Sequence, residues 1–137
     1  MQFSSVFEIN ETLIRETLEY ITGHKDDKVL FFIGLTDSFE GEGYDRDSLD
    51  VPMNQVDLLE RVSAIVGQKN VIAISFGGAP MDFSFEENVS ALLHMYLGGQ
   101  AVGEAIANLV SGKVNPSGKL PESFPLSKED YIGDKYY

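Results

Sequence analysis

The chain has no cysteine, so disulfide bonds and thiolate metal sites are both excluded. Its uninterrupted hydrophobic runs reach only about seven residues, far fewer than the roughly 20 that a membrane-spanning helix needs. The first residues contain neither a basic region nor a long apolar stretch, so they do not read as a signal peptide. Together these absences predict a soluble chain, and we expect a cytoplasmic location.

Basic residues are also scarce, with 10 Lys and Arg against 22 Asp and Glu, for a formal net charge of −12. Binding to a phosphate backbone or to an anionic membrane surface requires clustered Lys and Arg. The basic residues here are scattered along the chain. We therefore expect neither nucleic acid nor a membrane as a partner.

Two histidines are present, and neither lies in a pattern typical of a histidine–nucleophile site. His24 follows a polar helical stretch, and His94 lies within an apolar stretch, where we interpret it as a core histidine. The acids do not follow the alternating spacing of a calcium-binding loop. Gly98 and Gly99 lack the residues that would complete a phosphate-binding loop. We predict no cofactor and no metal site.

Strand and helix patterns alternate along the 137 residues, which is typical of an α/β domain with a mainly parallel sheet. Asn10 is a candidate cap for the first helix. The predicted helices cover residues 11–22, 54–66 and about 99–111, and the predicted strands cover residues 29–35, 71–76 and 91–97. We expect one domain over residues 1–137 with helices on both faces of the sheet, an α/β/α sandwich.

The predicted sheet is narrow, and its ends are less regular. Residues 120–124 are predicted as a short edge strand, and residues 126–137 as a loosely ordered tail. Phe31, Phe32, Phe76 and Tyr96 are interpreted as core residues of the strands. Since few strands leave an edge or a face uncovered, we also expect self-association into a homo-oligomer.

Residues 39–46 form an acidic loop directly after the first predicted strand, with three carboxylates, two glycines and one arginine. One interpretation is an acidic surface loop, and the other is a ligand site, because ligands gather where loops leave the carboxyl ends of strands. Glu40 and Glu42 do not suit the paired acids of glycoside cleavage, since residues two apart in an extended loop point the same way. A single acid that faces a nucleophile located elsewhere is the better geometry.

Several motifs together resemble the second, α/β-sandwich domain of the family 3 glycoside hydrolases. The resemblance covers about residues 28–125, with the motifs in the order and at the spacing of the family. They are EGEGYDR at 40–46, LDVP at 49–52, GGAP at 77–80, GQAVG at 99–103 and NPSGKLPESFP at 115–125. The chain is therefore similar to part of that domain, since family members usually have further strand and helix material on either side.

The resemblance implies a retaining β-glycosidase, commonly a β-glucosidase, that cleaves O-glycosidic bonds of β-linked glycosides. A separate (β/α)8 barrel domain, absent from this chain, would supply an aspartate nucleophile. The glutamate that aligns with the family's general acid/base is Glu42, and Glu40 is the fallback assignment. The resemblance also implies that Asp45 and Arg46 bind substrate or shape the loop, as an ion pair with each other. The chain alone would then be inactive.

A non-catalytic α/β module that retains the scaffold and binds a partner or a carbohydrate is the alternative function. The two hypotheses differ in whether Glu42 matters. Under the alternative, binding would not depend on the Glu42 carboxyl.

Overall fold

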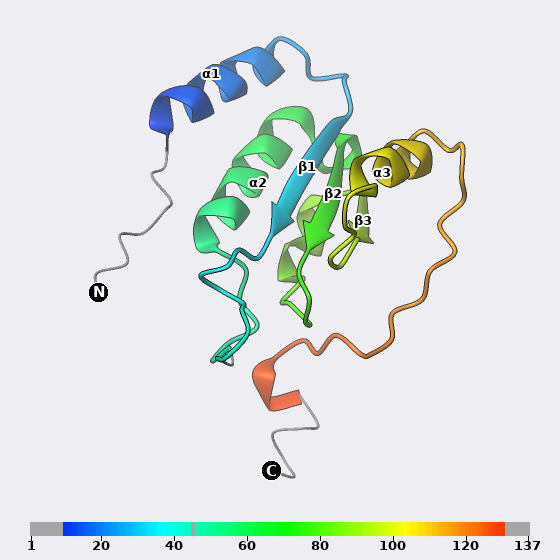
Figure 1. The fold of residues 1–137 in the computed structure, drawn as a ribbon. Helices are drawn as coiled ribbons and strands as arrows, with labels where there is room; N and C mark the ends of the chain where they lie inside the picture. Colours follow the sequence, from blue (N-terminus) through cyan, green and yellow to red (C-terminus); the bar gives the residue numbers. More distant parts are fainter. Residues whose placement is uncertain (1–9, 45, 131–137) are drawn as a thin grey trace.

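The computed structural model describes residues 10–44 and 46–130, which build a three-stranded parallel sheet flanked by helices (Figure 1). The strands are β1 (Val29–Gly34), β2 (Val71–Phe76) and β3 (Ala91–His94), and β2 lies between the other two. The α/β class and the parallel sheet predicted from the sequence are confirmed.

Helices lie on both sides of this sheet (Figure 1). The α-helices in the described residues are α1 (Glu11–Thr22), α2 (Met53–Val66) and α3 (Val102–Val110). Helices α1 and α2 lie on one side of the sheet and α3 lies on the other (Figure 1). Short 3-10 helices are η1 (Gln68–Asn70), η2 (Ser84–Asn88) and η3 (Lys128–Asp130).

The helix ends follow local chemistry that is readable in the sequence. The Asn10 side-chain oxygen accepts a hydrogen bond from the Leu13 N–H at 3.0 Å, which caps α1 as predicted. Pro52 precedes α2, where its missing N–H costs no helical hydrogen bond. Gly67 has a φ of 82° and ends α2. Both helices therefore lie within a residue of their predicted bounds.

The face of the sheet that packs on α2 holds most of the core. Alternation along the parallel strands places Phe31 and Ile33 of β1 beside Ala73 and Ser75 of β2. The core cluster of buried hydrophobic residues is Ile21, Ile33, Val51, Leu59, Val62, Val66, Val71, Ala73, Met81, Phe85 and Val89. It draws on α1, α2, η2 and two strands, so the elements on this face form one apolar unit.

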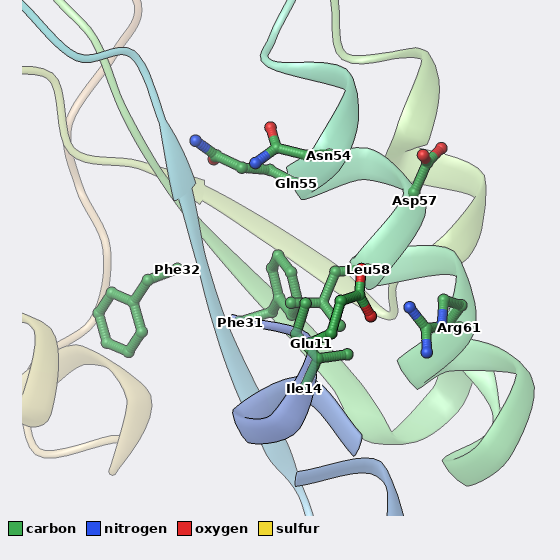
Figure 2. Close-up of a pocket in the computed structure, with 9 residues that line it drawn as sticks. All are labelled: Glu11, Ile14, Phe31, Phe32, Asn54, Gln55, Asp57, Leu58 and Arg61. Carbon is green, nitrogen blue, oxygen red and sulfur yellow. The ribbon is translucent and has the colours of Figure 1, made fainter. Parts of the chain in front are cut away.

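The opposite face of β1 is less covered. The side chains of Leu30 and Phe32 are 39% and 56% exposed. The Phe32 ring stacks on the Phe76 ring, with 6.3 Å between the ring centroids, but more than half of the Phe32 side chain stays exposed. Figure 2 shows Phe32 on the other side of β1 from Phe31. The prediction of Phe32 as a core residue is therefore wrong, because the helix on that side does not cover β1.

Strand β3 is shorter than the predicted 91–97. Met95 still donates its N–H to the Ser75 carbonyl at 2.9 Å, but Tyr96 has a φ of +49°. An extended strand requires a negative φ, so the chain must leave the sheet at this residue. Tyr96 is thus a loop residue rather than a strand residue, and that part of the prediction is wrong.

The predicted edge strand over residues 120–124 is also absent, although all five residues are described. Pro121 has no N–H to give to a ladder, and this segment contacts the body through a side chain instead. The Phe124 ring stacks on Phe83 at 4.9 Å. Of the predicted tail, residues 126–130 include η3, while residues 131–137 lie outside the described part of the chain.

A cavity of about 220 Å³ lies between α1, α2 and β1 (Figure 2). Phe31, Ile14 and Leu58 form its apolar part, while Arg61 and Asp57 stand at its rim (Figure 2). In the part of the chain that the structure describes, no helix has both the length and the apolar character needed to cross a bilayer.

Core packing under α2 makes a first prediction. Leu59 is fully buried, so Leu59→Ala should lower the free energy of unfolding by about 2–5 kcal/mol. Leu13, also a helical leucine, is 59% exposed, and Leu13→Ala should change it by less than about 0.5 kcal/mol. Urea unfolding of both variants provides the measurement. Equal losses from the two would contradict the packing described above.

Candidate functional site at the carboxyl ends of the strands

The loops that follow the strands leave the sheet at one edge, because the strands are parallel. Figure 1 shows the loop after β1 and the loop after β2 at the same end of the molecule. In open α/β sheets, ligands bind outside the carboxyl ends of the strands. The acidic loop of residues 39–46 lies at this edge, where the sequence predicts a site.

Glu42 lies at the tip of a tight turn. An antiparallel bridge between Gly41 and Tyr44 closes the turn, and Gly43 takes a φ of +94°, which favours glycine. A Cβ atom on Gly41 would come within 2.9 Å of the Tyr44 ring, so a side chain at this position would force the ring to move. The Tyr44 hydroxyl donates to the carbonyl oxygen of Asp37. The turn is thus closed by backbone and side-chain contacts, and Glu42 is exposed.

Glu40 lies two residues before Glu42 but has a different environment. Both of its carboxylate oxygens accept from the Gly78 N–H, each at 3.0 Å. Glu40 is half-buried, and Gly78 belongs to the loop after β2. The two acids, which are close in the sequence, therefore have different environments: Glu40 binds the neighbouring loop and Glu42 is exposed.

Arg46 attaches the other side of the turn to the same neighbouring loop. One guanidinium nitrogen donates to the Pro80 carbonyl at 3.1 Å and another donates to the Asp50 carbonyl at 2.9 Å. Burial lowers the pKa of Arg46, while the nearby carboxylates of Glu40 and Asp50 act in the opposite direction. The predicted partner Asp45 lies outside the described residues, so the ion pair between Asp45 and Arg46 stays a prediction.

His94 ends β3 behind these loops. One ring nitrogen, Nδ1, forms a hydrogen bond of 2.9 Å with the Ser75 hydroxyl, and the rings of Phe83, Tyr96 and Phe124 surround the imidazole. Its other nitrogen, Nε2, is buried without a partner. Burial lowers the pKa of His94, and the Glu40 carboxylate partly offsets this. Its packing agrees with a core histidine and does not indicate a catalytic base.

A larger cavity, of about 610 Å³, lies beside β3 and under the segment that follows α3. Its walls include Leu93, Tyr96, Leu109 and Leu120. Glu42 lines neither this cavity nor the one in Figure 2. Within residues 10–44 and 46–130, no group of three His, Cys, Asp or Glu side chains is arranged to hold a metal ion.

The sequence does not show that the loop after β2 provides hydrogen-bond partners for the acidic loop. These partners are backbone atoms of the GGAP motif at 77–80: the Gly78 N–H binds Glu40, and the Pro80 carbonyl binds Arg46. The only signal in the sequence is that a break rich in glycine and proline follows β2. Which loop it contacts depends on the pairing of the strands.

These features define an α/β domain with an acidic loop held at the carboxyl edge of its sheet. A family model described as the glycosyl hydrolase family 3 C-terminal domain matches residues 14–137. The chain belongs to this family, which confirms the resemblance found in the sequence, and the match contains all of residues 28–125.

Similar proteins agree with this assignment. Thermostable beta-glucosidase B of Acetivibrio thermocellus is 40% identical over 118 residues, which is 86% of this chain and 15% of that protein. An exo-alpha-(1->6)-L-arabinopyranosidase of Bifidobacterium longum is 41% identical over 109 residues, 80% of this chain and 14% of that protein. The chain thus spans about 15% of the length of these relatives.

Solved structures share the fold. The GH3 beta-glucosidase of Bifidobacterium adolescentis matches with a TM-score of 0.83 and 36% identity over 92% of this chain and 18% of that chain. The beta-glucosidase of Kluyveromyces marxianus in complex with glucose matches with a TM-score of 0.78 and 33% identity over 90% of this chain and 14% of that chain.

The shape of the Glu42 turn generates a second prediction. Gly43→Ala should lower the free energy of unfolding by about 1–2 kcal/mol, because a side chain disfavours positive φ even where space is free. Gly103, in helix α3, also has free space around it but no positive φ. Gly103→Ala should raise the free energy of unfolding by about 0.5–1 kcal/mol. Denaturant unfolding measures both, and a stabilising Gly43→Ala would refute the turn geometry.

The burial of His94 generates a third prediction. The pKa of His94 is lowered below its ordinary value of 6.5, so the unfolded chain binds more protons than the folded chain around and below that pH. The free energy of unfolding should therefore rise with pH through this range, and fall as the pH drops below about 6.5. His94→Asn, which keeps an acceptor near Ser75, should remove part of this fall. Urea unfolding between about pH 5 and 8 tests it, and an identical pH dependence in both proteins would contradict it.

Proposed function

We propose that this chain is the acid/base-bearing domain of a retaining β-glycosidase that hydrolyses β-linked glycosides such as β-glucosides. The observation that carries the proposal is the geometry of Glu42. Its carboxyl projects from a closed turn at the carboxyl edge of the sheet, and it is exposed. Membership of the glycosyl hydrolase family 3 C-terminal domain family supports the assignment of this glutamate as the acid/base.

Retaining cleavage takes place in two steps, and Glu42 would act in both. In the first step, an aspartate carboxylate attacks the anomeric carbon while Glu42 gives its proton to the leaving oxygen. In the second step, Glu42 takes a proton from a water molecule, whose oxygen then displaces the aspartate from the sugar. Glu42 returns to its protonated form, so the cycle closes.

The nucleophile in this proposal comes from outside the chain. Glu40, two residues from Glu42 on the same loop, has both carboxylate oxygens bonded to the Gly78 N–H, so it is a poor candidate for the nucleophile. The relatives are several times longer than this chain, which leaves enough length for a (β/α)8 barrel of about 250 residues. We therefore propose that a barrel supplies the aspartate, and that the chain alone is inactive.

Asp45 and Arg46 are proposed to shape the loop or to contact the substrate. For Arg46, the support is its pair of hydrogen bonds to Pro80 and Asp50, which occupy two of its nitrogens with backbone oxygens. This arrangement favours shaping of the loop. Asp45, next to it in the chain, is assigned by the resemblance alone.

We infer that the choice of sugar is made mainly outside this domain. Two relatives of nearly equal identity to the chain, 40% and 41%, carry the names of a beta-glucosidase and of an exo-alpha-(1->6)-L-arabinopyranosidase. A domain that supplies the proton donor suits either reaction. The sugar contacts would then lie in the barrel.

The fourth prediction concerns Glu42 in the assembled enzyme, meaning this domain joined to its barrel. Glu42→Ala should lower kcat by about 10²–10⁴-fold for glycosides with poor leaving groups, which need a proton donor. Glycosides with good leaving groups should still form the glycosyl-enzyme. Added azide should then restore turnover and give a glycosyl azide, because it attacks without a general base. Steady-state kinetics and product analysis provide the measurement.

Several outcomes would contradict this assignment. If Glu40→Ala gave the azide rescue and Glu42→Ala did not, the acid/base would be Glu40. If the purified chain alone hydrolysed a nitrophenyl β-glucoside in a Glu42-dependent way, the need for a barrel would be refuted. Glycan binding that is unaffected by Glu42→Ala, without hydrolysis by the assembled enzyme, would favour the non-catalytic module.

A further inference from the structure

We infer that Glu40 is a positioning residue, which holds the Glu42 turn against the loop after β2 so that the Glu42 carboxyl keeps one location. This role deepens the proposed function and rests on it. It also gives different roles to Glu40 and Glu42, which have the same side chain and are only two residues apart.

The first support is the geometry of the Glu40 carboxylate. Both oxygens lie 3.0 Å from the Gly78 nitrogen, so one N–H is shared between them. Hydrogen bonds to an ionised acceptor are about twice as strong as bonds between neutral groups. The contact joins residues 38 positions apart, so it ties together two loops that leave different strands.

The second support is the matching contact of Arg46 on the other side of the turn. Glu40 binds the N–H of Gly78, and Arg46 binds the carbonyl of Pro80, two residues further along the same loop. Glu42 lies between these two contacts in the sequence. A closed turn held at both sides has little freedom to swing, so Glu42 is fixed relative to the edge of the sheet.

The charges of Glu40 and Arg46 reinforce these contacts. The Glu40 carboxylate acts to raise the pKa of Arg46 against the effect of burial, which means that the two charged groups attract each other across the turn. Removing Glu40 would therefore weaken both contacts. The Glu40 oxygens are also engaged by a backbone donor, which leaves Glu42 as the glutamate free to exchange a proton with a substrate.

The fifth prediction compares Glu40→Ala with Glu60→Ala in the assembled enzyme. Glu60 is an exposed glutamate on α2, outside the acidic loop, and serves as the control. Glu40→Ala should lower kcat about 10- to 100-fold, as expected when a reacting group is misplaced by about an ångström. The KM should stay close to that of Glu60→Ala, while the melting temperature of Glu40→Ala should be slightly lower because the contact to Gly78 is lost.

Amide hydrogen exchange tests the contact itself. In Glu40→Ala, the peptide that covers residues 77–81 should exchange about 10- to 100-fold faster, because the Gly78 N–H loses its charged acceptor. Glu40→Gln keeps one acceptor oxygen and should lie between Glu40→Ala and the unaltered enzyme, both in exchange and in kcat. Glu60→Ala should leave exchange of this peptide unchanged.

Azide distinguishes positioning from proton transfer. Glu40→Ala still carries Glu42, so azide should neither restore its turnover nor yield a glycosyl azide. A glycosyl azide from Glu40→Ala, an unaltered kcat or unaltered exchange at residues 77–81 would each overturn the positioning role. If Glu40→Ala accelerated exchange but Glu42→Ala retained full activity, the contact would stand and the proposed function would fall.

Discussion

The parallel pairing of β1 with β2 is the constraint on which the candidate site depends. Gly34 lies opposite Phe76 in the register, so both strands end at the same level of the sheet. The two following loops must therefore start side by side. Only this arrangement brings the carboxylate of Glu40 within 3.0 Å of the Gly78 N–H, across 38 residues of sequence. A shift in register would separate donor from acceptor.

The same register explains why the two faces of the sheet differ. Alternating side chains of β1 point to opposite faces, and α2 covers one of them with fully buried residues such as Leu59. On the other face, Leu30 and Phe32 remain partly exposed because α3 lies nearer β3 (Figure 1). Self-association through the face that carries Leu30 and Phe32 stays a prediction. The chain spans about 15% of the length of its longer relatives.

The charged residues of the acidic loop differ in what they contact. The backbone of the loop after β2 supplies a donor at Gly78 and an acceptor at Pro80, and the charged side chains of Glu40 and Arg46 use them. Glu42, between these contacts, is left exposed. Under the proposed function, the structural and the chemical role would belong to neighbouring residues of one short motif. Under the same proposal, such a loop would suit different glycosidases, since it would hold a carboxyl in place while the sugar contacts lie elsewhere.

The sequence by itself determined the elements whose signals are local. Asn10 and the apolar spacing after it mark α1, the apolar runs mark β1 and β2, and Gly67 marks the end of α2. The acidic loop and its family were recognisable because their motifs are contiguous. Only the tertiary structure decided that β3 ends before Tyr96, that residues 120–124 form no strand and that Phe32 is exposed. It also decided that Glu40 binds Gly78, because a hydrogen bond between distant residues depends on how the strands between them pair.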